Sequence, residues 1–200
     1  MIGKLILVTK LIRGSFYFKQ FPFGRKSRVF IDNNAKVINP NRIVVKGTMS
    51  CGRNAWIHAI TQYFEHYYEP MIEFGDSFSC GNDFHLAATN RIVIGSNVLI
   101  GSYVLISDHS HGIYEGVEEV SVPLSNPAFR KLTMGNISIG DNVWIGDSVK
   151  ILGNVSIGSG SIIGAGSIVV KDVPINSIVC GVPARVVKVW CEQTGTWVRC

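Results

Sequence analysis

The chain has 200 residues, which is enough for one domain with a sizeable hydrophobic core. Its net charge of +5 is too small to indicate nucleic-acid binding, and no stretch interleaves basic with aromatic residues, but it suits an anionic ligand such as a phosphate-bearing coenzyme or an acidic glycan. The five cysteines are scattered and form no CxxC pair, which excludes a disulfide framework and favours a reducing, cytoplasmic compartment.

The first predicted element is an N-terminal helix with its linker in residues 1–25. Three basic residues interrupt its apolar run, so the run is too short to cross a bilayer, and no small-residue cleavage site follows it. We expect this helix to cap the element that follows. The alternative is a basic amphipathic helix that lies on the inner face of the inner membrane.

Residues 139–179 repeat with a period of six. An aliphatic residue recurs at every sixth position from Ile139 to Ile175, and the fifth position of each unit is small or β-branched, from Val143 to Val179. A period of six fits neither an α-helix nor an alternating strand. It predicts short strands separated by bends, three to a coil, with every aliphatic position pointing into a triangular prism and the fifth position at the corners. The predicted fold is an all-β parallel β-helix.

The same spacing extends the predicted solenoid over residues 26–183. It is interrupted by an insert at 62–70, which we interpret as loop-like or helical, and by two jumps of two residues that accompany NRIV sequences at 41–44 and 90–93. We interpret each jump as a corner bulge that restores the register of the strands. The pattern disappears in 107–136, and a segment of that length inside a compact domain is typical of a functional loop.

The ejected loop begins with the sequence DHSHG at residues 108–112, so reactive side chains leave the prism at the root of the loop. The pattern resumes after the loop and ends near residue 183. We expect residues 184–200 to form a short helix or tail that caps the C-terminal end, since a solenoid needs its last coil covered.

Four blocks carry a resemblance to a known family: IVIGSNVLIGSYVLISDHSHG, IGDNVWIGDSVKIL, GAGSIVVKDVP and GVPARVVK. In this order, over about residues 30–190, they resemble the hexapeptide-repeat acyltransferases with a left-handed β-helix, of the bacterial lipopolysaccharide or capsule O-acetyltransferase type. The resemblance implies left-handed coils, a homotrimer whose sites are shared between subunits, acetyl-CoA as co-substrate and a carbohydrate acceptor. No metal is expected.

His111 is the fifth residue after Ile106, and members of this family carry their general-base histidine at this offset. A neutral imidazole can remove the proton of a sugar hydroxyl as the hydroxyl attacks the thioester. No nucleophilic Ser or Cys context is found, so direct transfer is expected. His109 is the alternative base, and in an extended chain it faces the other side. Asp108 either orients an imidazole or makes a turn.

The resemblance also implies positions for the two substrates. The acceptor would contact Asn82, His85, His109 and Trp144, although a turn role for Asn82 and a packing role for Trp144 are open alternatives. The coenzyme would lie in a groove between neighbouring prisms. Its expected contacts are Trp144, Gly146, Gly164, Ala165, Gly166, Ser167, Lys171, Arg185 and Lys188.

Three other functions on the same prism stay open. An N-acetyltransferase acting on an amino nucleotide sugar would use the same base, and a binding scaffold would use none. A metal-dependent enzyme of the carbonic anhydrase type needs three protein ligands on Zn²⁺, for which His85, His109 and His111 would have to converge.

Overall fold

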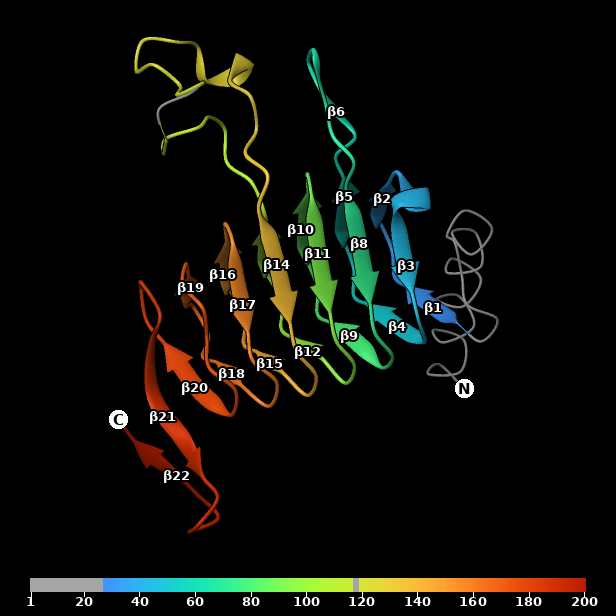
Figure 1. Ribbon diagram of the computed structural model, residues 1–200. Coiled ribbons are helices and arrows are strands. Elements are labelled where there is room, and N and C mark those ends of the chain that lie inside the picture. The colour runs from blue at the N-terminus through green and yellow to red at the C-terminus, as the bar shows by residue number, and fades with distance from the viewer. Residues whose placement is uncertain (1–26, 117–118) are drawn as a thin grey trace.

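The structure is a computed structural model that describes residues 27–116 and 119–200 (Figure 1). The chain winds into a three-sided prism, and successive strands pass in turn to a first, a second and a third sheet. The predicted parallel β-helix is therefore confirmed. The left-handed winding stays a prediction, and the predicted N-terminal helix lies outside the described residues. No helix in the described part of the chain is long and apolar enough to cross a membrane.

The three faces are parallel sheets built from short strands. The first sheet contains β1 (Arg28–Ile31), β4 (Thr48–Cys51), β9 (Phe78–Cys80), β12 (Leu99–Ile100), β15 (Trp144–Ile145), β18 (Ile162–Ile163) and β20 (Ser177–Cys180). The second sheet contains β2 (Lys36–Ile38), β5 (Trp56–Ala59), β10 (His85–Ala88), β13 (Leu105–Ser107), β16 (Lys150–Leu152) and β19 (Ile168–Val169). The third contains β3 (Ile43–Val45), β8 (Met71–Phe74), β11 (Arg91–Ile94), β14 (Asn136–Ile139) and β17 (Val155–Ile157).

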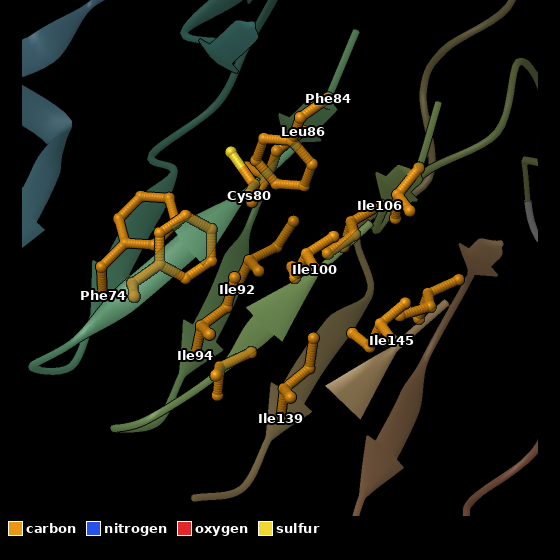
Figure 2. Close-up of a cluster of buried hydrophobic side chains, with 14 of the residues drawn as sticks. Phe74, Cys80, Phe84, Leu86, Ile92, Ile94, Ile100, Ile106, Ile139 and Ile145 are labelled. Carbon is orange, nitrogen blue, oxygen red and sulfur yellow. The ribbon is translucent and has the colours of Figure 1, made fainter. Parts of the chain in front are cut away.

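The six-residue column fills the inside of the prism, as predicted. Side chains of the same column stack from coil to coil; Ile106, for example, pairs with Ile151 across β13 and β16. Figure 2 shows these side chains packed against one another between the sheets. The fifth position also points inward, because Val143 and Val149 are no more than 1% exposed. In β17, for example, Val155 and Ile157 are buried and the residue between them, Ser156, faces solvent.

Ile175 is the exception to the predicted column, because 67% of its surface is exposed. The last coil is two residues shorter here: Val173 bridges to Ile157 on the third side and takes the inward place instead. Pro174 follows at once and has no N–H to continue a ladder. The two-residue shortening persists on β20, where Val179, a fifth-position residue, pairs with Ile163 of the column.

All the interruptions fall at the corner between the second and third sheets, which we call the loop corner. It comprises residues 39–42, 60–70, 89–90 and 108–135. The first jump is a 3-10 turn at Pro40–Arg42. The insert at 62–70 is neither a loop nor a helix: β6 (Gln62–Tyr63) and β7 (His66–Tyr67) form an antiparallel hairpin. Figure 1 shows the hairpin and the long loop projecting from the same side of the prism.

The C-terminal segment is a hairpin and contains no helix. β21 (Arg185–Cys191) runs antiparallel to β20, and β22 (Thr196–Arg199) pairs with β21, so the first sheet continues beyond the last coil. Ala184 and Val186 pack against the end of the core. The segment predicted as a short helix or tail is therefore a pair of antiparallel strands.

Candidate active site

Asp108 is the buried centre of the loop corner. Its carboxylate accepts hydrogen bonds from the backbone N–H groups of Thr89, at 2.8 Å, and Asn90, at 2.9 Å. It also accepts from the Thr89 hydroxyl at 3.1 Å and contacts His109 Nδ1 at 3.0 Å. One carboxylate therefore holds the turn at residues 89–90 and also contacts an imidazole. The imidazole it contacts is that of His109.

His109 lies beside two other imidazoles on the outer face of the second sheet. His85 faces outward from β10 and stacks on Trp56 of β5, with ring centroids 4.4 Å apart and planes within 3°. His58 lies on the same strand as Trp56, with its ring 6.2 Å away. Burial lowers the pKa of His58 and His85 below the ordinary value of 6.5, and the charge of neighbouring imidazoles, His109 among them, lowers it further. The neutral forms of these two side chains are thus favoured.

Trp56 and His58 were missed from the sequence. Trp56 pairs with His85 across adjacent coils, and His58 pairs with Ala87. Their outward alternation along β5 was visible, but the insert at 62–70 makes this coil longer than its neighbours and hides the register with β10.

His111 is exposed, and its contacts are with other residues than those around His109. Its backbone forms an isolated bridge with Leu132, and its Nδ1 lies 3.3 Å from the Tyr63 hydroxyl of the hairpin. The two rings meet edge to face at 5.2 Å and 81°. The Tyr63 hydroxyl donates to the carbonyl oxygen of Ala128 at 2.6 Å. In the structure, Asp108 is therefore the side-chain partner of His109, and Tyr63 is the side-chain partner of His111.

The hairpin and the long loop support each other. Tyr68 is buried and its hydroxyl accepts from the Leu132 N–H at 3.0 Å. Phe64 at the hairpin turn contacts Phe129 edge to face at 4.8 Å. Farther out, the Arg130 guanidinium binds the Ser125 carbonyl at 2.8 Å and so orders the tip of the loop. His111 is therefore carried by an anchored segment.

The residues predicted to contact the coenzyme lie on other parts of the prism. Trp144 is 52% exposed on the outer face of the first sheet. Gly146 follows it at the corner between the first and second sheets, and a Cβ there would lie 2.7 Å from the nitrogen of Ala165 in the next coil. Gly164, Gly166 and Ser167 belong to the same corner, and the Ser167 hydroxyl donates to the Gly164 carbonyl.

The remaining predicted residues are distributed as follows. Asn82 lies at a corner of the prism, where its Oδ1 accepts a hydrogen bond from the Arg53 N–H at 2.9 Å. This contact fits the alternative in which Asn82 is a turn residue. Lys171 is exposed in the turn after β19, whereas Arg185 and Lys188 lie on β21. Within residues 27–116 and 119–200, no three His, Cys, Asp or Glu side chains are placed to hold a metal ion. His85, His109 and His111 thus do not converge as a zinc site of the carbonic anhydrase type requires.

Comparison with known proteins agrees with this architecture. Residues 136–171 match the family model described as bacterial transferase hexapeptide (six repeats). WbbJ of Escherichia coli K12, whose name as a lipopolysaccharide biosynthesis O-acetyl transferase is provisional, is 31% identical over 173 residues, or 86% of this chain and 88% of WbbJ. The galactoside O-acetyltransferase of the same strain is 37% identical over 137 residues, which are 68% of this chain and 62% of that protein.

A solved structure of a galactoside acetyltransferase in complex with coenzyme A superposes with a TM-score of 0.52 at 26% identity. The match covers 96% of this chain and 80% of that one. The repeat, the coiled fold and the near full-length relative lead to one conclusion: the chain belongs to the hexapeptide-repeat acyltransferase family.

Proposed function

We propose that this enzyme transfers acetyl from acetyl-CoA directly to a hydroxyl group of a carbohydrate acceptor in surface-polysaccharide biosynthesis, with His111 as the general base. The names of its relatives supply the reaction and the acceptor class. The observation that carries the proposal is the exposed imidazole of His111, held through Nδ1 at the root of a projecting loop. Its other ring nitrogen, Nε2, is then available to a substrate.

The chemistry follows from the weak nucleophilicity of a sugar hydroxyl at neutral pH. The imidazole takes the hydroxyl proton as the oxygen attacks the thioester carbon, and the negative charge on the carbonyl oxygen needs a donor, which we assign to a backbone N–H. Collapse releases the coenzyme thiolate, and the proton on the imidazole passes to the sulfur. General-base catalysis of this kind is worth about 10²–10⁴ in rate.

We also propose that the coils are left-handed and that the protein is a homotrimer. Gly146 and the segment 164–167, proposed to hold the coenzyme, lie at the corner before the strands of the second sheet, whereas His109 and His111 lie after these strands, at the loop corner. A strand of the second sheet separates them within one chain. We infer that, in the trimer, Gly146 and the segment 164–167 of one subunit face the loop corner of the next subunit, with Lys171, Arg185 and Lys188 near the phosphates of the coenzyme. We also infer a cytoplasmic location, where acetyl-CoA is made.

His109 is a second candidate for the base, because its Nδ1 is held by the buried Asp108 carboxylate at 3.0 Å. A carboxylate in that position fixes the orientation of a base and stabilises the imidazolium that forms. The acceptor would then approach the outer face of the second sheet, where His85 also lies.

The two candidates are separated by measuring coenzyme A release with a panel of sugar and amino-sugar acceptors. We expect His111→Ala to lose about 10²–10⁴ in kcat, with folding and assembly unchanged. His66→Ala, on the same hairpin as Tyr63, is the matched control and should keep full activity. Full activity in His111→Ala together with loss in His109→Ala would transfer the role to His109. Mass spectrometry of surface glycan from cells with and without the protein should show one acetyl group of difference.

A further inference from the structure

We propose that Tyr63 is a positioning residue that holds the neutral His111 imidazole in its Nδ1–H form, with the lone pair on Nε2 directed to the acceptor. This inference rests on the proposed function, because it assigns a supporting residue to the proposed base. Tyr63 comes from the hairpin β6–β7, which the six-residue repeat neither contains nor requires.

The proton of the Tyr63 hydroxyl determines which partner donates in the contact with His111. The Tyr63 hydroxyl has a single proton, and it donates this proton to the Ala128 carbonyl at the short distance of 2.6 Å. Toward His111 the hydroxyl therefore offers only a lone pair. The 3.3 Å contact with His111 Nδ1 is then a hydrogen bond in which the ring nitrogen donates. In a neutral imidazole that has its proton on Nδ1, Nε2 is the basic nitrogen.

The two side chains are attached to one buried anchor. Ile60, Tyr68, Ala87 and Leu132 form a small apolar cluster outside the prism, and Tyr63 packs against it. The backbone of His111 bridges to Leu132 of that cluster. Tyr63 and His111 are thereby kept at a fixed separation even though His111 itself is exposed. An exposed side chain without such a partner would exchange rotamers on the nanosecond timescale.

The hydrogen bond also persists through the reaction. When the acceptor O–H bond breaks and the new C–O bond forms, the proton moves to Nε2 and the ring becomes an imidazolium. Both ring nitrogens then carry protons, and Nδ1–H still donates to Tyr63. The proton on Nε2 leaves for the sulfur as the C–S bond breaks. Tyr63 thus supports the same ring orientation before and after proton transfer, and its oxygen faces the positive charge.

Nitrogen-15 NMR of histidine-labelled protein tests the tautomer without any acceptor. The His111 signals are assigned from their loss in His111→Gln. We expect the parent protein to show a protonated Nδ1 and an unprotonated Nε2 at a pH where the ring is neutral. Tyr63→Phe should shift the population toward Nε2–H, the form favoured in water, whereas Tyr67→Phe on the same hairpin, 76% exposed, should not.

Kinetics give the second readout, with the acceptor found active in the panel. Tyr63→Phe should lower kcat by about tenfold, less than loss of the base, and leave KM for acetyl-CoA unchanged. An Nε2–H tautomer in the parent protein would overturn the inference, and so would full kcat in Tyr63→Phe. If His111→Ala is inactive while Tyr63→Phe is fully active, only the positioning role fails. If His111→Ala is fully active, the general-base assignment itself fails.

Discussion

Asp108 joins two parts of the site through one carboxylate whose side chain is fully buried. It accepts hydrogen bonds from the backbone N–H groups of Thr89 and Asn90, which lie at a corner and not within a strand, and it contacts His109. A buried carboxylate is tolerated only when donors surround it, and these donors come from another coil. The second jump in the repeat is therefore stabilised by a residue of the next coil.

We expect Asp108→Asn to lower the free energy of unfolding by about 1–3 kcal/mol, because the amide presents a donor to backbone donors. Urea unfolding measures the loss. Asp147→Asn is the matched control, since Asp147 accepts one backbone N–H, from Ser102, at an exposed corner. Equal losses in the two variants would show that burial of the Asp108 carboxylate contributes nothing.

The imidazoles of His58 and His85 should make stability depend on pH. Their pKa values are lowered in the folded protein, first by burial, so the unfolded chain binds more protons below pH 6.5. Their contribution to stability is complete above that value and decreases as the pH falls from 6.5 toward the lowered values. Urea midpoints at pH 7 and at about pH 5 should differ less in the double variant His58→Gln/His85→Gln than in the parent protein. A His66→Gln control that flattened the dependence equally would contradict this assignment.

The sequence predicts which residues of the DHSHG segment belong to the candidate site better than it predicts which side chains contact one another there. DHSHG was found because it is polar, rich in histidine and placed where the repeat stops. That Asp108 contacts His109, and that Tyr63 contacts His111, depends on which residues the insert and the loop bring together. Both segments lie outside the repeat, so no period relates residue 63 to residue 111.

At the scale of single elements, the corners are the most restrictive part of the fold. Coils stack at the roughly 4.8 Å spacing of paired strands, so the residue that follows a strand touches the backbone of the next coil. At Gly75 a Cβ would lie 2.5 Å from the carbonyl carbon of Gly95. Glycine is needed there for the close approach of two backbones, and its φ is not the reason.

Gly75→Ala should therefore destabilise the protein by about 1–3 kcal/mol, as other overpacked substitutions do, because the two backbones must separate. Thermal or urea unfolding measures the effect. Ser79→Ala, at an outward position of the following strand, is the control and should stay within about 0.5 kcal/mol of the parent protein. A tolerated Gly75→Ala would mean that adjacent coils move apart without loss.

The six-residue repeat predicts some of the strands and not others. The six-residue column specifies the strands from β1 to β5 and from β8 to β19, because each of these strands packs its own apolar column residue against the coils above and below. It is silent on β6–β7 and on β21–β22, whose pairing is antiparallel and has no such period. The alternating pattern of β21, with every second residue half-buried, was a weaker signal for a strand than the expectation of a capping helix.

At the scale of the whole molecule, the prism has one continuous core that extends from the first described coil to the last. Every coil contacts only its neighbours, so stability is close to a sum of coil terms and interface terms. A residue in the middle contributes to two interfaces at once. Ile151 is such a residue, because β16 pairs with β13 on one side and with β19 on the other.

Ile151 and Ile175 share the six-residue column but occupy opposite environments, at 0% and 67% exposure. Ile151→Ala should lower the free energy of unfolding by about 2–5 kcal/mol, because it removes buried methylene groups and leaves a cavity between two coils. Ile175→Ala should change it by no more than about 0.5 kcal/mol, because the side chain is already in solvent. Parallel urea titrations at one protein concentration make the comparison, so that assembly affects both variants alike. Similar losses in the two variants would mean that the column stays in register through Pro174, and that the last coil is not shortened by two residues.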